Sequence, residues 1–157
     1  FMQFDSQGNR IEGTFFLKRP NFIRFRYAPP SREEIISRGA GFYVIDREAR
    51  TQYAYAQEHV PLRQFLGDRV SLINSNLTDV IMSDAYVSVM IVDDSPIGTV
   101  QASLIFDRTT FDLVQWSLIE PSGVETTFAV YDVEKNIDIP DSYFVIDASY
   151  RSVAAPE

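Results

Sequence analysis

Apolar and polar side chains alternate along most of the chain, which is the pattern of half-buried β-strands. Residues 11–18 and 22–27 are two such segments, and they flank a turn at Pro20, because proline lacks the N–H that a central strand needs. Arg24 and Arg26 occupy one face of the second segment, where they form either a solvated basic strip or pairs with carboxylates. The other face of this predicted hairpin is apolar and aromatic, and it is formed by Ile11, Gly13, Phe15, Leu17, Ile23, Phe25 and Tyr27.

The same alternation predicts about ten strands, joined by short turns. The candidate segments for the other strands cover residues 1–5, 35–37, 42–45, 51–56, 79–83, 86–92, 100–106, 112–118 and 124–130, with a short final one over 143–146. Residues 31–34 are expected to form a charged loop, residues 93–98 a turn and residues 151–157 a tail. Short strands at near-regular spacing are typical of an antiparallel meander, and about ten twisted strands usually curl or close. The prediction is a mainly β fold, a curled antiparallel sheet around an aromatic-lined interior.

The spacing becomes helical over residues 61–67. Proline suits the first helical position and glycine the C-terminal cap, as Pro61 and Gly67 would here. A helix of about two turns is too short to be stable in water alone. We therefore expect a small α lid that covers the open edge or mouth of the sheet with Leu62, Phe65 and Leu66.

Composition excludes several classes of function. The chain has 157 residues, enough for one domain, which we expect over residues 1–147 with 148–157 as a tail. A net charge of −8 argues against a nucleic-acid partner, because phosphate binding needs a clustered positive field. No run of about 20 apolar residues is present, so we expect no stable membrane insertion.

Groups suited to catalysis or metal binding are sparse. The absence of cysteine excludes disulfides, thiolate metal sites and cysteine nucleophiles. The single histidine, His59, is interpreted as a solvated loop residue, since no Gly-x-Ser-x-Gly elbow accompanies it. The pair Asp93-Asp94 does not have the spacing of a calcium loop. We predict no catalytic residue, no metal and no cofactor, and hence no enzyme.

The apolar rows and Arg19 each admit two interpretations. The rows either fill an ordinary core or line a hollow interior for an apolar ligand, and periodicity does not separate these alternatives. Arg19 falls on the same face of the strand as Phe15 and Leu17. Its guanidinium must therefore find hydrogen-bond acceptors or reach water. It is either a surface residue beside a turn or a latch that donates to carbonyls of the covering helix.

The opening hairpin resembles the LolA family of periplasmic outer-membrane lipoprotein carriers. The residues that carry the resemblance are Gly13, Arg19, Pro20, Asn21, Arg24, Phe25 and Tyr27. Further similar stretches follow in the family's order over roughly residues 1–131, namely Phe42 to Asp46, Val60 to Leu66, Leu104 to Asp107, Leu113 to Trp116 and Gly123 to Thr127. No residues of this sequence match the family's N-terminal amphipathic helix, and the last 25 or so residues match poorly.

This resemblance implies an unclosed antiparallel barrel with a helical lid over a hydrophobic cavity. The expected cavity residues are Phe15, Leu17, Ile23, Phe25, Tyr27, Leu62, Phe65, Leu66, Phe106 and Trp116, and Arg19 with Pro20 would hold the lid closed. The implied partners are acylated lipoproteins as cargo, the inner-membrane lipoprotein-releasing transporter complex and the outer-membrane lipoprotein receptor. The implied location is the periplasm, with a signal peptide preceding residue 1 in the gene product.

Three other functions remain open from the sequence. The chain could be the outer-membrane receptor of the same fold, a LolB-like protein, or a relative that senses lipoproteins. It could also be a solid β-domain that acts as an interaction module. A filled interior would favour the last of these.

Overall fold

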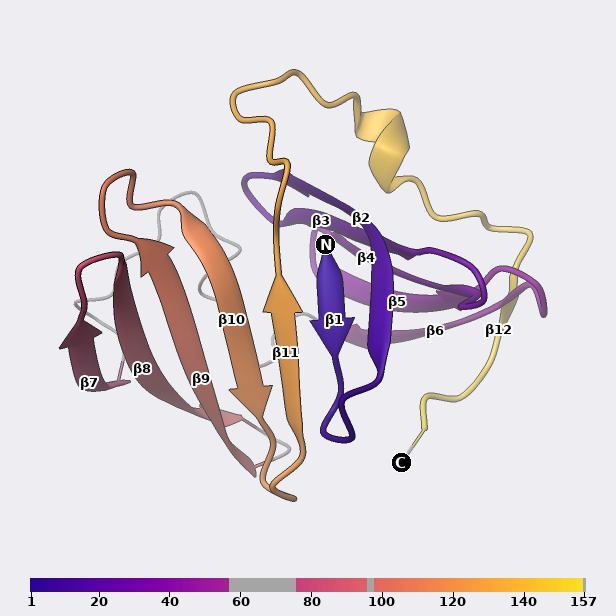
Figure 1. The fold of residues 1–157 in the computed structure, drawn as a ribbon. Helices are drawn as coiled ribbons and strands as arrows, with labels where there is room; N and C mark the ends of the chain where they lie inside the picture. The colour runs from indigo at the N-terminus through magenta and orange to yellow at the C-terminus, as the bar shows by residue number, and fades with distance from the viewer. Residues whose placement is uncertain (57–75, 96–97, 157) are drawn as a thin grey trace. The chain divides into compact units, whose positions relative to one another are not determined.

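A computed structural model describes residues 1–56, 76–95 and 98–156 of the chain. The predicted helix over 61–67 and His59 lie outside the described residues. The described residues form twelve strands, so the prediction of about ten was too low. Their order is β12-β6-β5-β4-β3-β2-β1-β11-β10-β9-β8-β7, with β12 and β7 at the two ends, so the described sheet is unclosed (Figure 1).

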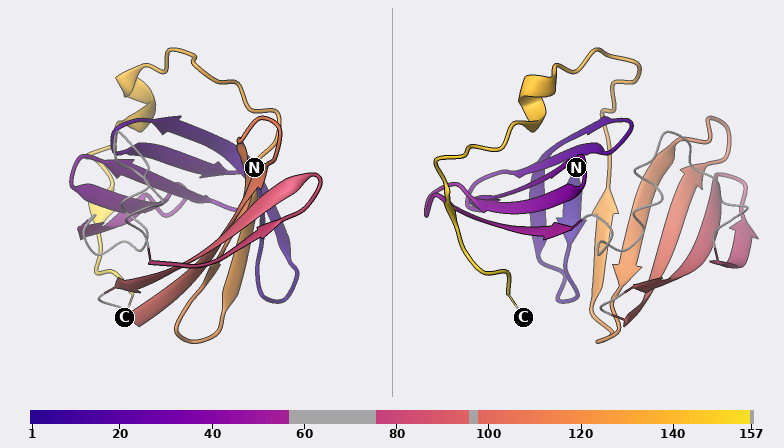
Figure 2. Two further views of the ribbon diagram at one scale, coloured as in Figure 1. Left: turned by 90° about the vertical axis from the view of Figure 1, so that its left-hand side faces the viewer. Right: turned by 180° about the vertical axis from the view of Figure 1, so that it is seen from behind.

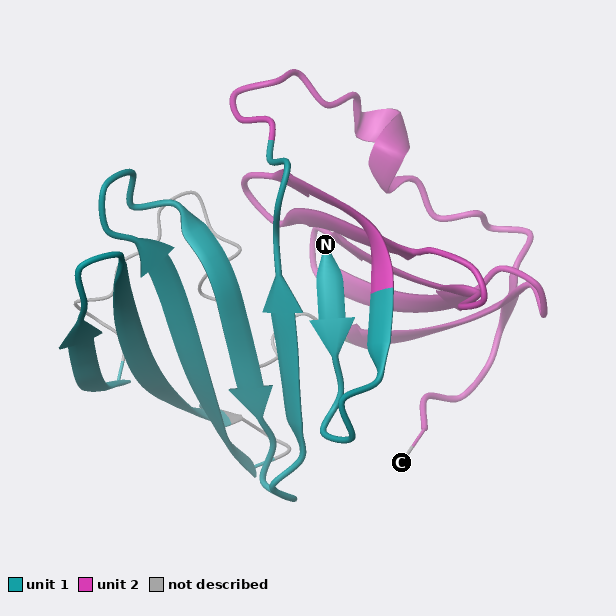
Figure 3. Cartoon of the chain, viewed as in Figure 1, with its two compact units in different colours: residues 1–11, 71–133 teal, residues 12–70, 134–157 magenta. Residues whose placement is uncertain are grey.

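The chain divides into two compact units, which are described separately. Unit 1 contains residues 1–11 and 71–133, and unit 2 contains residues 12–70 and 134–157 (Figure 3). Strand β2 (Arg10–Lys18) begins in the first unit and continues in the second.

Unit 1 contains six antiparallel strands. In sheet order these are β1 (Met2–Phe4), β11 (Glu125–Ala129), β10 (Leu113–Ile119), β9 (Gly98–Asp107), β8 (Tyr86–Ser95) and β7 (Asn76–Met82). The register places its most buried apolar side chains on one face, because Val89 opposes Leu104 and Ile91 opposes Ala102. The strands that the alternation predicted in this unit are therefore confirmed.

The turn predicted over residues 93–98 is wrong in part. Asp93 opposes Val100 and Asp94 opposes Thr99, so β8 continues to Ser95 before the chain reverses. The Thr99 hydroxyl donates to Asp94 Oδ1 at 2.8 Å. A cross-strand polar pair of this kind stabilises the exposed end of a hairpin, and turn-forming residues alone did not reveal it.

Unit 2 contains an antiparallel meander with one parallel strand at its edge. The meander is formed by β2, β3 (Phe22–Tyr27), β4 (Glu33–Arg38), β5 (Gly41–Asp46) and β6 (Thr51–Ala56). Glu33 and Glu34 belong to β4, so the charged loop expected over 31–34 is shorter than predicted. The expected tail also contains a strand, β12 (Arg151–Ser152), which pairs in parallel with β6.

The C-terminal segment runs alongside the sheet of unit 2 (Figures 1 and 2). The strand predicted over 143–146 is wrong: Asp141–Phe144 form a 3-10 helix, η3, after Pro140. The side chain of Phe144 is 0% exposed and belongs to the core of this unit. Local alternation could not indicate this, because the position of Phe144 is set by packing against strands more than a hundred residues earlier.

Candidate functional site

The sheet of unit 2 has two faces of different character. One, which we call the core face, packs its apolar residues with Phe144, Ile139, Ile146 and Tyr150 of the C-terminal segment; the strand residues are Phe16, Phe22, Ile36, Tyr43 and Ile45. Successive side chains of a strand point to opposite faces, so the residues that alternate with these form a second surface. We call this second surface the aromatic face.

The strand register arranges the aromatic face in rows that cross the sheet. One row is continuous and apolar across five strands: Phe15, Phe25, Ile35, Val44 and Tyr53 oppose one another in turn. The next row is formed in the same way by Leu17, Ile23, Ser37, Phe42 and Tyr55. We call the first of these the central row.

The structure brings five predicted cavity residues together on this face. Phe15 opposes Phe25 with ring centroids 4.8 Å apart, Leu17 opposes Ile23, and Tyr27 follows in β3. The first four are half-buried, whereas Tyr27 is only 5% exposed. In the described part of the chain, the core cluster of unit 2 lies on the opposite face.

The other predicted cavity residues are distributed differently. Phe106 and Trp116 belong to unit 1, where the Trp116 ring stacks on Phe128 with centroids 5.2 Å apart. Leu62, Phe65 and Leu66 lie outside the described residues. The role of all five residues in a cavity therefore stays a prediction.

Arg19 and Pro20 form the turn that joins β2 to β3. Both residues are exposed, the Arg19–Pro20 peptide is cis, and Asn21 follows with a φ of 66°. The turn was predicted correctly from proline and asparagine, since asparagine tolerates the left-handed region better than most residues. The helix that Arg19 was predicted to latch lies outside the described residues.

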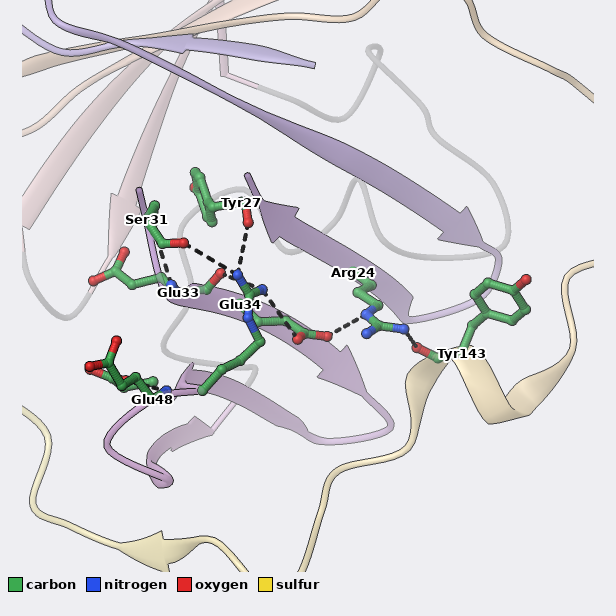
Figure 4. Close-up of polar contacts among 9 residues, drawn as sticks. Arg24, Tyr27, Ser31, Glu33, Glu34, Glu48 and Tyr143 are labelled. Atoms are coloured by element: carbon green, nitrogen blue, oxygen red, sulfur yellow. Dashed lines mark hydrogen bonds and ion pairs between the residues drawn. The ribbon is translucent and has the colours of Figure 1, made fainter. Parts of the chain in front are cut away.

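The core face contains an ion-pair network that the sequence did not reveal. The Arg24 guanidinium donates from Nε to Glu34, whose side chain is 7% exposed, and Arg47 Nη1 lies 3.6 Å from the second carboxylate oxygen of Glu34 (Figure 4). Arg24 had been interpreted as part of a solvated basic strip or as a partner for carboxylates, and the second interpretation is confirmed. The sequence indicated the pairing of Arg24 with Glu34 only weakly, because Glu34 was predicted to be in a loop.

This network fastens two irregular segments to the sheet. Arg24 Nη1 donates to the carbonyl oxygen of Tyr143 at 3.0 Å, which holds the end of η3. Arg47 donates to the carbonyl oxygens of Tyr27 at 2.9 Å and Ser31 at 3.3 Å, on either side of Pro29-Pro30. Buried charge is stabilised in this way only when its hydrogen-bonding capacity is largely used.

A second set of polar contacts holds the rest of the C-terminal segment. Lys18 Nζ donates to the carbonyl oxygen of Ile139 at 3.0 Å and to Asp141 at 2.8 Å. The hydrogen bond and the charge of Lys18 lower the pKa of the Asp141 carboxyl. Further along, Gln52 donates to the carbonyl oxygen of Tyr150 at 3.1 Å. The core face is thus covered by a segment that is anchored along its length.

Acidic residues border the aromatic face at one end of the strands. Glu33 opposes Asp46, which opposes Thr51. Burial, followed by the charge of Glu33, raises the pKa of the Tyr27 phenol above its ordinary value. Burial also raises the pKa of Tyr53, with smaller contributions from Tyr55 and Glu33. Both phenols therefore remain neutral and keep their hydroxyl protons at physiological pH.

Two cavities adjoin the sheet of unit 2. One, of about 400 Å³, lies beside Pro29-Pro30 and includes Arg32 and Glu48. The other, of about 290 Å³, lies between β4–β6 and residues 153–156. Across residues 1–56, 76–95 and 98–156, no group of three acidic or histidine side chains is placed to hold a metal ion. In those same ranges, no helix has the length and apolarity needed to span a membrane.

Comparison with known proteins addresses the resemblance directly. A search of curated proteins gives no match. The sequence model of the family described as "Outer membrane lipoprotein carrier protein LolA" matches residues 1–147, which is most of the chain. The match extends beyond residue 131, where the resemblance was expected to end. The matched region includes the hairpin that carries the Arg19-Pro20-Asn21 turn and every residue of the aromatic face. The chain therefore belongs to the LolA family.

Proposed function

We propose that this protein is a periplasmic carrier that binds the acyl chains of lipoproteins on the aromatic face of unit 2. It receives them from the inner-membrane transporter complex and passes them to the outer-membrane receptor. The observation that carries this proposal is the family match over residues 1–147. LolA proteins are lipoprotein carriers, and the aromatic face supplies an apolar surface of the required kind.

The rows of the aromatic face support acyl binding on physical grounds. Neighbouring strands are about 4.8 Å apart, so the central row extends for roughly 19 Å across five strands. Its members are apolar except for the phenol oxygen of Tyr53, and those in β2–β5 are half-buried. A surface of this length can receive an extended acyl chain without burying an ionised group beneath it.

The free energy of acyl burial explains why a carrier is needed. Transfer of an acyl chain from water gains about 0.8 kcal/mol per methylene. Unassisted diffusion of a lipoprotein through water is therefore strongly unfavourable. A carrier must cover the chains, yet release them to the receptor, so its binding must be opposed by a competing contact. The predicted lid over 61–67, with its apolar residues on the sheet, would compete in this way.

Arg19 is proposed as the latch of that lid. A charge-assisted hydrogen bond contributes about 1.5–3 kcal/mol, which is enough to hold a lid and small enough for a ligand to reverse. Substitution of Arg19→Leu is expected to change the exposure of the lid and to impair transfer of lipoprotein to outer-membrane vesicles. Transfer at the wild-type rate would remove the latch from the proposal.

The acyl-binding site is tested by displacement of a fluorescent bis-anilinonaphthalene probe with a triacylated lipopeptide. Phe25→Glu is expected to abolish saturable displacement, because it places a charge in the central row. Thr14→Glu is the matched control, since Thr14 is exposed on the opposite face of the adjacent strand. Equal displacement in all three proteins would exclude the aromatic face as the site. No displacement from the wild-type protein would favour the solid β-domain.

The direction of transfer is tested separately. Lipoprotein release from inner-membrane vesicles that carry the transporter, followed by transfer to outer-membrane vesicles, is expected for a carrier. A protein that accepts cargo only from another carrier and retains it would instead be a receptor of the same fold.

A further inference from the structure

The cavity of about 290 Å³ lies at the end of the central row and differs chemically from it. Tyr53 is the last member of that row and also lines the cavity. The C-terminal segment also lines the cavity, through Val153, Ala154 and Pro156. An acyl chain on the central row would therefore lead directly to this cavity.

Two carboxylates face the cavity from adjacent strands. Glu33 and Asp46 oppose each other in β4 and β5, and both line the cavity. Among the described residues, no ion pair involves the Glu33 carboxylate. Asp46 accepts hydrogen bonds from the N–H groups of Glu48 at 2.9 Å and Ala49 at 2.8 Å, and both use only Oδ1. The cavity therefore carries negative charge that the described cations do not pair.

The remaining walls are suited to an organic cation. The Tyr53 ring lines the cavity and meets the Tyr55 ring edge to face at 5.8 Å, and aromatic rings of this kind attract cations. The Thr51 hydroxyl can accept a hydrogen bond, and Val44 and Val153 supply apolar contact. Carboxylate, aromatic and apolar surfaces in one cavity favour an ammonium group attached to an apolar body over a hydrated metal ion.

We propose that the cavity between β4–β6 and residues 153–156 binds the ammonium group of an acylated ligand whose chains lie on the central row. This inference rests on the proposed function and specifies which ligands the site prefers. It predicts that an acylated peptide with a free α-amino group binds more tightly than the same peptide with that amine acylated.

The test uses two diacylated lipopeptides that differ only in N-acetylation of the amino terminus. Each displaces the bis-anilinonaphthalene probe from the full chain at low and at high salt. Because Glu33 is exposed, we expect the free amine to bind about two- to fivefold more tightly at low salt. High salt should reduce this preference, since exposed charges are screened.

Three variants localise the preference. Glu33→Gln should remove it, and Ala154→Lys should remove it independently by placing an ammonium group of the protein in the cavity. Glu48→Gln is the matched control: Glu48 is an exposed carboxylate that pairs with Arg32 and lines the other cavity. A preference that Glu48→Gln abolishes and Glu33→Gln retains would overturn the assignment.

The outcomes separate this inference from the function on which it rests. If neither peptide displaces the probe, the acyl-binding function fails. If both displace it equally, the function stands and the ammonium site is overturned. Lysophosphatidylethanolamine compared with lysophosphatidylglycerol then tells whether a lipid headgroup supplies the ammonium group as well as an amino terminus does.

Discussion

The two faces of the sheet in unit 2 are built from the same five strands, yet they have different roles. The core face is closed by Phe144 and its neighbours and is crossed by the Arg24–Glu34–Arg47 network. The aromatic face has a continuous apolar row and a border of carboxylates. Adjacent residues of one strand, such as Ile35 and Ile36, therefore belong to surfaces with different roles. The difference shows that apolarity alone does not identify this core: within the described residues, it is the face on which the C-terminal segment packs.

The largest effect is expected from removal of the side chain that closes the core face. Phe144→Ala should lower the free energy of unfolding by about 3–5 kcal/mol, because it leaves a cavity among residues that are fixed by the sheet. Urea unfolding followed by tryptophan fluorescence and circular dichroism measures the change. Val145→Ala is the control, since Val145 is 56% exposed, and it should change stability little. Equal losses in both variants would contradict the assignment of Phe144 to the core.

The buried ion-pair network should give the next largest effect. Glu34→Gln leaves Arg24 and Arg47 without their shared carboxylate, and breaking a buried pair costs about 3–5 kcal/mol. Because both guanidinium groups retain some exposure, we expect about 2–3 kcal/mol in urea unfolding. Glu48→Gln, which removes an exposed pair with Arg32, should cost less than about 0.5 kcal/mol. An unchanged free energy of unfolding in Glu34→Gln would show that the network only orients the C-terminal segment.

Neighbouring isoleucines of β4 test the division between the faces most directly. Ile36 is 2% exposed on the core face, so Ile36→Ala should cost about 2–5 kcal/mol and leave acyl binding unchanged. Ile35→Ala, on the half-buried aromatic face, should cost about 1 kcal/mol and weaken displacement of the probe by lipopeptide. Both quantities are measured on both variants. Binding lost in Ile36→Ala and kept in Ile35→Ala would reverse the assignment of the faces.

The smallest effect is a pH dependence in the attachment of the C-terminal segment. The pKa of Asp141 is lowered in the folded protein by Lys18, so this carboxylate stabilises the fold above its unfolded pKa of about 3.8. That contribution is lost as the pH falls below this value and through the lowered folded pKa. Midpoints of urea unfolding between pH 6 and pH 2.5 should fall less steeply in Asp141→Asn than in the wild-type protein.

A double-mutant cycle identifies the partner of Asp141. Lys18→Gln should flatten the same part of the pH profile, and the double variant should flatten it no further. Independent, additive effects of the two substitutions would show that the pKa of Asp141 is lowered by another group.

Much of the local structure followed from the sequence alone. Alternation located the strands of both units except β12, although it also predicted a strand over 143–146 that the structure does not have. Proline and asparagine located the turn at Arg19-Pro20-Asn21, and the hairpin motif indicated the family that the comparison confirmed. These features depend on side-chain periodicity and on backbone preferences of single residues, which act over a few positions. The same alternation grouped Phe15, Phe25 and Tyr27 on one face, and the strand register agrees.

Only the tertiary structure decided which face is the core. Phe16, Ile36 and Ile45 alternate with Phe15, Ile35 and Val44, so both faces carry apolar side chains and periodicity treats them alike. The choice depends on Phe144, which reaches the sheet from more than a hundred residues away, and on the carboxylate of Glu34 between two arginines. A local pattern cannot encode these contacts, because burial is a property of the folded chain. The sequence determined the strands and the two faces that they present, and long-range packing decided that, among the described residues, the C-terminal segment covers the core face.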